Sequence, residues 1–427
     1  MKKFIDSLFI IAIFFTFIIG QYQNAYDRVT PQVLYLSIIN FASLFYIFYS
    51  ISLDKIIDYI KKNKLFLSYT AYILITGISI IVAENKTEAI ITYAKYLTYF
   101  LTFCVFLFLG KFSKVNLIDL FLKLLVVSIF IESSAVIFNV YDSVVLNGQE
   151  FVRNGQNYKG FSANINIVAF SLVMKSPVIS YYLFKSNNKF VLTICYLLFF
   201  MISSALFFLL TRGAFLAFIL VIVFVFLYML IRKTKTSFKK IIISLFVFFL
   251  SYTATNQIMS SNKSNVVIDR ISTIKLNNED ESINQRLRYY SAALKSIRMN
   301  PILGVGVGNW KFISIKYDSK NMTEYTVPYY VHNDFLQIAA EIGLLGILFF
   351  LYFIFNPFLL LMKKIFSSKE NLIDLVVFLM ISVYIIDSLL NFPINRPISH
   401  ILFLLLIVVF QTNEKKSSKW KFINHSY

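Results

Sequence analysis

The sequence predicts an all-α integral membrane protein, with about twelve transmembrane helices and one large extracytoplasmic loop that carries short amphipathic helices. Three observations support this class. Of the 427 residues, 58% are hydrophobic, 18% are aromatic and only 15% are charged. The apolar residues fall in stretches long enough to cross a bilayer, and the basic residues fall in short runs between those stretches. A soluble core could not bury this much apolar surface, so much of it must face lipid.

Stretches of about 17 to 25 apolar residues are long enough to cross the membrane as helices. Nine come first, at 4–21, 32–51, 65–83, 89–109, 117–140, 161–184, 190–210, 213–231 and 239–255. Three more follow a long polar stretch, at 334–362, 371–391 and 397–413. The predicted organisation is therefore helices within 1–255, a loop at 256–331, helices within 332–413 and a basic tail at 414–427.

Basic residues alternate in density from one connection to the next. Since lysine and arginine collect in cytoplasmic loops, this alternation predicts that both termini are cytoplasmic and that the loop at 256–331 is extracytoplasmic. The basic side is formed by Lys2/Lys3, Lys55/Lys61/Lys62/Lys64, Lys111/Lys114, Lys185/Lys189, Arg232/Lys233/Lys235/Lys239/Lys240, Lys363/Lys364/Lys369 and Lys415/Lys416/Lys419/Lys421, and the opposite side by Arg28, Lys86, Arg153, Lys159, Arg212 and Arg396.

The formal net charge of +19 could suggest a nucleic-acid partner. Because the cations lie at the ends of apolar spans, we infer that they fix the orientation of the helices in the membrane. The expected partner is therefore a lipid bilayer and no nucleic acid. Cys104 and Cys195 lie within apolar spans without metal-site spacing, so neither a disulfide nor a zinc site is expected. No small-residue cleavage site follows Gly20, which indicates an uncleaved first helix.

The long loop contains an amphipathic helix at 282–300. Apolar residues recur there at helical spacing, which predicts one apolar stripe lying on the membrane or covering a cavity. At 100° per residue, Arg286 falls at the edge of that stripe, while Arg288 and Lys295 point away from it. Arg286 is therefore expected to face inward. The stripe is formed by Ile283, Leu287, Tyr290, Leu294 and Ile297.

Three glycines follow within five residues, at Gly304, Gly306 and Gly308. They resemble a dinucleotide-binding fingerprint, but no βαβ unit surrounds them, so that interpretation is set aside. Glycines at this density let the backbone turn tightly, or let it come close to a ligand or a helix. A turn without further role is the simpler interpretation.

A polar, aromatic segment leads from the loop into the next membrane helix. Asp334 followed by Gln337 predicts an N-cap with its N3 partner, so that the helix begins beside His332 and directs its positive dipole end outward. His332 can be either an interfacial side chain without chemistry or an acid–base group.

Arg212 lies at the outer junction of two apolar helices, where topology needs no cation and an anionic partner is expected. Gly213 and Ala217 have the spacing of residues that allow close helix packing. Other charged residues within or near spans are expected to pair with one another and are assigned no chemistry, namely Lys95, Glu132, Lys175, Glu341 and Asp387.

Three motifs occur in one order along roughly 195–405 and together resemble the O-antigen ligase family. They are Thr211-Arg212-Gly213, then Arg286-x-x-x-Tyr290 to Pro301-x-x-Gly304-x-Gly306-x-Gly308-Asn309, then His332-Asn333-Asp334 to Glu341-x-Gly343-x-x-Gly346. That family includes O-antigen ligases, O-antigen and exopolysaccharide polymerases and bacterial O-linked protein oligosaccharyltransferases. Tyr290 departs from the family pattern, which usually has tryptophan there.

The resemblance implies a metal-independent, inverting glycosyltransferase of the bacterial inner membrane that acts in surface polysaccharide biosynthesis without a cofactor. Its donor would be an undecaprenyl-diphosphate-linked glycan, and its acceptor a lipid-linked repeat unit or the lipid A core. Arg212 and Arg286 would hold the diphosphate and His332 would take the proton of the acceptor hydroxyl. The residues expected to contact substrate are Arg288, Tyr290, Tyr330 and Asn333.

A transporter or lipid-linked-glycan flippase is the competing class, since many such proteins also have twelve helices with both termini inside. No internal repeat is visible between the two halves, and the distinctive residues gather at the outer surface. These two features favour the enzyme. The motifs serve the donor and the proton transfer, so they do not separate ligase, polymerase and protein oligosaccharyltransferase.

Overall fold

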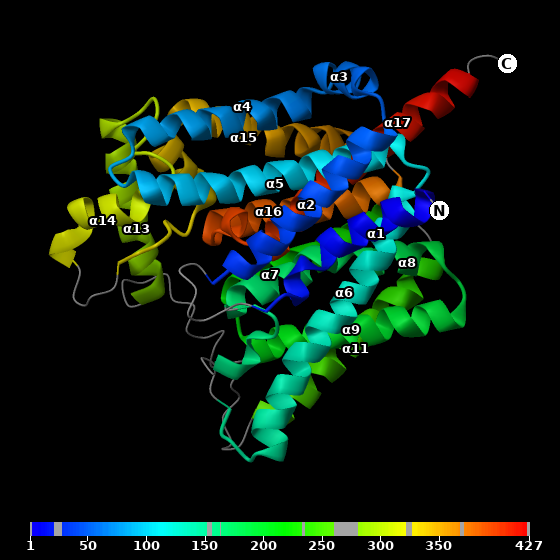
Figure 1. Ribbon diagram of the computed structural model, residues 1–427. Helices are drawn as coiled ribbons and strands as arrows, with labels where there is room; N and C mark the ends of the chain where they lie inside the picture. The colour runs from blue at the N-terminus through cyan, green and yellow to red at the C-terminus, as the bar shows by residue number, and fades with distance from the viewer. Residues whose placement is uncertain are drawn as a thin grey trace.

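The computed structural model describes residues 2–20, 28–151, 156–162, 164–232, 235–259, 281–321, 327–367 and 371–424. Its long helices run between two ends of the molecule (Figure 1). In chain order the elements are α1 Lys2–Phe14, η1 Phe15–Ile18, α2 Thr30–Ser50, α3 Leu53–Lys61, α4 Lys64–Ser79, η2 Ile80–Val82, α5 Lys86–Phe112, α6 Leu117–Val140, η3 Tyr141–Leu146, η4 Gln156–Lys159, α7 Ile165–Lys175, α8 Pro177–Lys185, α9 Lys189–Leu209, α10 Arg212–Arg232, α11 Lys235–Met259, α13 Glu281–Met299, α14 Trp310–Asp318, η5 Ser319–Asn321, α15 Asp334–Phe366, α16 Leu372–Leu390, η6 Pro393–Asn395 and α17 Pro397–Asn424.

The predicted class, an all-α membrane protein, is confirmed. In the described part of the chain, eleven helical segments are long and apolar enough to cross a membrane, one of them formed by α7 and α8 together. The predicted first span, 4–21, is the exception, because α1 ends at Phe14 and continues only as the short η1. The regular part of α1 covers roughly 20 Å, less than the ~30 Å of a bilayer core.

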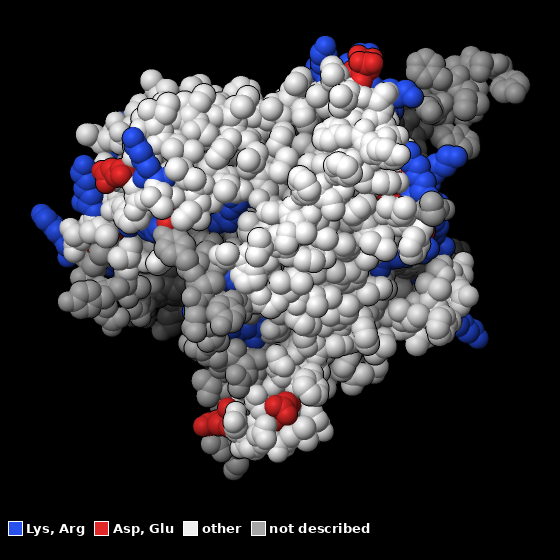
Figure 2. All heavy atoms as spheres, viewed as in Figure 1, with Lys and Arg blue, Asp and Glu red and all other residues white. Residues whose placement is uncertain are grey.

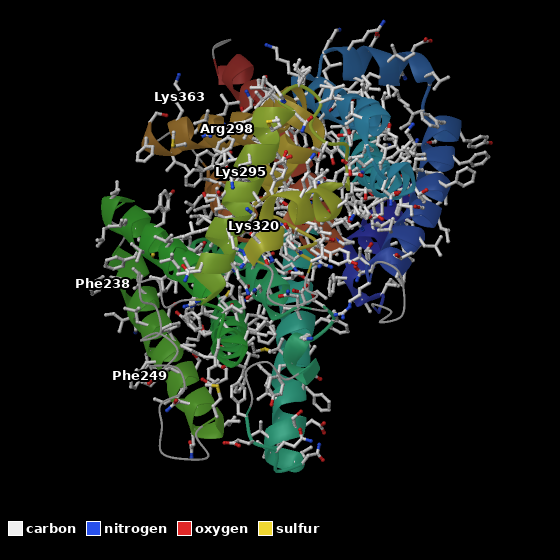
Figure 3. The ribbon with its side chains drawn as sticks, turned by 90° about the vertical axis from the view of Figure 1, so that its left-hand side faces the viewer. Phe238, Phe249, Lys295, Arg298, Lys320 and Lys363 are labelled. Atoms are coloured by element: carbon white, nitrogen blue, oxygen red, sulfur yellow. The ribbon has the colours of Figure 1, made fainter. Side chains whose placement is uncertain are left out.

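The helices form three groups. On one side α4, α5 and α15 pack together, and on the other α9 packs against α6 and α11 (Figure 1). Between them lie α7, α16 and α17, of which α7 and α17 are the most deeply buried, whereas α2 and α11 have the fewest buried residues among the spans. Phe238 and Phe249 of α11 project from the periphery in Figure 3, as expected of side chains that face lipid.

The two ends of the bundle differ. The N- and C-terminal helices α1 and α17 reach one end, and α13 and α14 cover the other (Figure 1). Figure 2 shows lysine and arginine side chains gathered at both ends, with a band almost free of charge between them. Figure 3 looks onto the α13 end, where Lys295, Arg298 and Lys320 lie at the surface. This arrangement fits the predicted alternation; which end faces the cytoplasm stays a prediction.

The predicted loop at 256–331 contains two helices in its described part. The amphipathic helix predicted at 282–300 is confirmed as α13, but its buried face differs from the predicted stripe. Leu287 and Leu294 are 58% and 46% exposed, whereas Ala292 and Ala293 are buried. These small side chains let α13 approach α14 and α15 closely, so the leucines are left on the outside.

Charged groups inside the bundle follow the pairing prediction in one case and depart from it in another. Lys175 forms an ion pair with Glu132, and the Ser171 hydroxyl donates to the same carboxylate at 2.9 Å. Asp387 instead accepts a hydrogen bond from the Asn391 side chain at 2.7 Å. A buried carboxylate can accept a hydrogen bond from an amide in place of an ion pair with a cation, and sequence alone does not show which of these two partners it has. The predicted last span, 397–413, agrees with the apolar part of α17 at Pro397–Glu414, and the helix itself continues beyond that span to Asn424.

Candidate active site

The start of α15 lies one residue earlier than predicted. Asn333, in extended conformation, is the N-cap, and its side-chain oxygen accepts a hydrogen bond from the Leu336 amide at 3.0 Å. Asp334 is the first helical residue, and its carboxylate accepts a hydrogen bond from the Ile394 amide at 3.0 Å. The prediction that Asp334 is the N-cap is therefore wrong. Its side chain instead fastens the beginning of α15 to the loop between α16 and α17.

His332 occupies the turn just before this cap. Its φ of 60° lies in the left-handed region, which is uncommon for residues other than glycine and carries backbone strain. The Tyr290 hydroxyl donates to the His332 carbonyl at 3.1 Å and approaches the Leu389 carbonyl at 3.0 Å. The imidazole ring lies 5.1 Å from the Phe392 ring and 6.3 Å from the Tyr289 ring. The turn is thus held between α13 and the end of α16.

The electrostatic setting of His332 keeps its imidazole neutral. The pKa of His332 is lowered to about 4, mainly by burial and in addition by the positive charges of the Arg286 and Arg396 guanidinium groups. A free imidazole titrates near neutral pH, so His332 departs clearly from the ordinary behaviour of a histidine. Its Nδ1 is buried and has no hydrogen-bond partner among the described residues. A neutral imidazole with an unused ring nitrogen is able to accept a proton.

The two arginines of α13 have different surroundings, as the helical register predicts. Arg286 acts electrostatically on both His332 and Tyr290, so it faces the turn that holds His332. Arg288 points to α14, where its Nε lies 2.9 Å from the Asp318 carboxylate, itself buried. Arg288, expected to contact substrate, thus has a structural partner that fixes α14 against α13.

Arg212 is the first residue of α10 and follows a tight reversal. Leu210 ends α9 with a φ of 47°, and only Thr211 separates it from α10. Gly213 lies against the end of α16, where a Cβ atom would be 3.1 Å from the Leu390 side chain. Because the neighbouring Leu389 carbonyl receives the Tyr290 hydroxyl, the Arg212 and Tyr290 segments reach consecutive residues of α16. The three sequence motifs therefore converge at one end of this helix.

The glycine segment reaches a break in α15. Gly343 has φ 82° and ψ −179°, so the helix is interrupted at this residue. The amides of Val305 and Gly306 donate to the Ala340 and Glu341 carbonyls at 3.0 and 2.9 Å. Close approach to a helix, one of the two possibilities for these glycines, is thus what the structure shows, and the segment supplies hydrogen bonds that the broken helix lacks.

Glu341 was expected to pair with a cation, but it binds backbone amides. Its two carboxylate oxygens accept hydrogen bonds from the Gly308 and Trp310 amides at 3.0 and 3.1 Å. The carboxylate therefore anchors the glycine segment and the first residue of α14 to the outer part of α15.

A cavity of about 750 Å³ lies between α2, α5 and α15, and the segment that leads into the His332 turn forms part of its wall. Tyr330 is the one predicted site residue on its wall; His332, Arg286 and Arg212 do not line it. Tyr330 stacks on Phe392 with ring centroids 4.2 Å apart, and the Arg396 guanidinium lies 4.9 Å from the Phe392 ring.

Sequence reasoning missed both Phe392 and Arg396, counting Arg396 only as a loop cation. The signal that could have indicated Arg396 is the Asn-Arg-Pro sequence between two membrane helices. The residue before a proline is restricted to an extended backbone, so Arg396 has a constrained position in this short loop.

Fold and site together define a multi-pass, all-α membrane protein with a basic, aromatic site at one end of its bundle. No group of three His, Cys, Asp or Glu side chains suited to a metal ion occurs in the part of the chain that the structure describes.

Residues 197–351 match the family model described as O-antigen ligase. The match includes α10, α13 and the start of α15, so it contains Arg212, Arg286 and His332. It confirms the resemblance that the three motifs indicated and supports an O-antigen ligase-type membrane enzyme. A search of curated proteins finds no match to this chain.

Proposed function

We propose that this chain is a glycosyltransferase of a bacterial inner membrane, which transfers a glycan from an undecaprenyl-diphosphate carrier to an acceptor hydroxyl on the outer face. The observation that carries the proposal is that the segments carrying Arg212, Arg286 and His332 meet at one end of α16, through Gly213 and the Tyr290 hydroxyl. They come from three separate motifs within the segment that matches the O-antigen ligase family. The α13 end of the bundle would then face away from the cytoplasm, with both termini on the cytoplasmic side.

The donor diphosphate needs cations close to the membrane surface. A guanidinium group can give two parallel hydrogen bonds to phosphate oxygens and always carries its charge. Arg212, at the start of α10, and Arg286, which faces the His332 turn, are placed to receive such a group. They would stabilise the negative charge that grows on the diphosphate as the glycosidic bond breaks, so no metal ion is required in this scheme.

His332 would act as the general base. As the acceptor oxygen attacks the anomeric carbon, its proton passes to the imidazole, the new glycosidic bond forms, and the diphosphate leaves with the old bonding pair. One direct displacement inverts the configuration at that carbon. A pKa of about 4 makes a weak base, but a diphosphate beside Arg286 would offset one of the charges that depress it. Donor binding would thus strengthen the base that the reaction requires.

The decisive experiment compares three variants in purified full-length protein supplied with undecaprenyl-diphosphate-linked glycan. His332→Ala is expected to bind the donor and transfer nothing, whereas Arg212→Ala and Arg286→Ala are expected to bind the donor about tenfold or more weakly. Arg298→Ala is the matched control, because Arg298 is exposed on the same helix as Arg286. Undiminished transfer by the His332 variant would refute its role as base.

The same preparation separates the enzyme from the competing class. A flippase would move the lipid-linked glycan across a proteoliposome membrane and leave the carrier linkage intact. A glycosyltransferase releases undecaprenyl diphosphate in proportion to the bond formed. Translocation without release would overturn the proposal.

A further inference from the structure

The 750 Å³ cavity carries an unusual number of cations for its surroundings. Its wall includes Arg28, Lys95, Lys311 and Arg396, contributed by four separate parts of the chain. Figure 2 shows a few basic side chains set among uncharged residues in the middle of the view, on the side of the α13 end. Like charges on one cavity wall repel one another and attract anions, so the gathering of four cations calls for an explanation.

The carboxylates on the same wall do not balance these cations. Glu88 is paired with Lys311, with Oε1 and Nζ 2.6 Å apart, and Glu341 is occupied by the backbone amides of α14 and the glycine segment. Arg28 and Arg396 have no carboxylate partner among the described residues. The Nε atom of Arg396 is also buried, and it has no hydrogen-bond partner among the residues that the structure describes. The cavity therefore has positive charge to offer to an anion.

The position of Arg396 connects the cavity to His332. The Arg396 guanidinium lies over the rings of Phe392 and Tyr330, at 4.9 and 5.7 Å, and the imidazole of His332 packs edge-on against the same Phe392 ring. Arg396 and Arg286 are also the two cations that depress the pKa of His332. His332 is thus flanked by the Arg286 region and by the cavity, while Arg286 and Arg212 lie outside the cavity wall.

We propose that this cavity binds an anionic sugar of the acceptor, a phosphorylated sugar or a sugar carboxylate, through Arg28 and Arg396 with Lys95 and Lys311 adding to the field. The inference rests on the proposed function and extends it by assigning the acceptor a site separate from that of the donor diphosphate. The acceptor hydroxyl would then reach His332 past the edge of the Phe392 ring, and the donor would reach it from the Arg286 side.

The remaining wall suits a sugar. Tyr329 and Tyr330 offer aromatic faces, and Asn164, Gln337 and Asn395 offer amide groups that can both donate and accept hydrogen bonds. A volume of about 750 Å³ lies within the range of roughly 300 to 1,000 Å³ found for small-molecule sites. The loop that carries Arg396 is fixed, since Asn395 accepts a hydrogen bond from the Tyr96 hydroxyl at 3.3 Å.

The test measures binding of three probes to the full-length protein in lipid nanodiscs without donor: glucose 6-phosphate, glucuronic acid and glucose. An anionic probe is expected to bind about tenfold or more tightly than glucose, since a hydrogen bond to a charged group contributes that much. Preference for glucose 6-phosphate identifies a phosphorylated acceptor, and preference for glucuronic acid identifies a sugar carboxylate. Equal binding of all three probes would refute the proposal.

Variants locate the bound probe. Arg28→Gln is expected to weaken binding of the preferred anionic probe about tenfold. Lys320→Gln is expected to leave this affinity unchanged, because Lys320 is an exposed cation at the same end of the bundle. Arg286→Gln is also expected to leave it unchanged. If Arg286→Gln abolishes binding and Arg28→Gln does not, the probe occupies the donor site. The proposal that the cavity binds the acceptor is then refuted, while the proposed function stands. Failure of the proposed function itself would appear separately, as transfer by the His332→Ala variant.

Discussion

Replacing Gly343 with alanine should disconnect the candidate site from the membrane bundle. A Cβ at this residue would overlap the Ile302 carbonyl, and its φ of 82° with ψ of −179° is a conformation open almost only to glycine. The backbone strain amounts to about 1–3 kcal/mol. Moving the helix off Ile302 would also break the bonds from Val305 to Ala340, from Gly306 to Glu341 and from Leu344 to Pro301, each contributing about 1 kcal/mol.

Together these contributions reach roughly 4 kcal/mol, or close to a thousandfold in the equilibrium between the docked and undocked glycine segment. Glycan transfer and thermal unfolding of the purified protein would be measured side by side, and transfer should fall about a hundredfold or more. Gly20→Ala is the control, because its Cβ would have no described atom within 4 Å. A Gly343→Ala protein with the parent's melting temperature and activity would refute the reasoning.

The other predictions concern topology, protonation, metal ions and acceptor. In a variant lacking Cys104 and Cys195, Lys320→Cys should react with an impermeant thiol reagent in intact cells and Asp54→Cys only after lysis; the reverse result would invert the predicted topology. Histidine NMR should show His332 protonating only near pH 4, and Arg286→Gln should raise that pKa, since a positive charge is removed; an unchanged value would place Arg286 elsewhere. Because the folded-state pKa lies below the unfolded value of about 6.5, the stabilisation from His332 should be complete above pH ~6.5 and decline as the pH falls toward 4. EDTA should leave transfer intact, as arginine neutralises the diphosphate; loss of transfer restored by magnesium would contradict this. Finally, a deletion strain should carry altered surface glycan, with single repeats indicating a polymerase and polymer stranded on the carrier a ligase; loss of glycosylated protein alone would show that the acceptor is a protein.

The parts of this protein that sequence predicted well are those with a short-range signal. Hydrophobic length located the membrane helices, because each must satisfy its backbone hydrogen bonds within itself. Helical spacing separated Arg286 from Arg288, and the structure indeed directs one toward His332 and the other toward Asp318. The order of the three motifs indicated a family resemblance, and the structure adds that the segments carrying Arg212, Tyr290 and His332 meet at one end of α16.

What sequence could not provide depends on partners distant along the chain. The buried face of α13 is set by the helices that it packs against, so Leu287 and Leu294 of the predicted apolar stripe are exposed, whereas Tyr290 and Ile297 pack inward as predicted. Asp334 was predicted to be an N-cap, because the neighbouring sequence gives no sign that its carboxylate accepts a hydrogen bond from the distant Ile394 amide. The Asn-Arg-Pro sequence could mark Arg396 as a constrained residue, but its place beside His332 arises only because the loop between α16 and α17 folds back against that turn.

The interruption of α15 has a consequence for how the protein is assembled. The carbonyls of Ala340 and Glu341 find their hydrogen-bond donors in residues 305–306, which leave the ribosome before α15 does. Neither segment is self-sufficient: the glycine stretch has no fold of its own, and the broken helix carries unfilled acceptors at the membrane surface. The finished geometry of α15 therefore depends on docking of the loop that precedes it. A chain that places α15 in the bilayer without the loop in register would be recognisable as misassembled, through polar backbone left exposed to lipid.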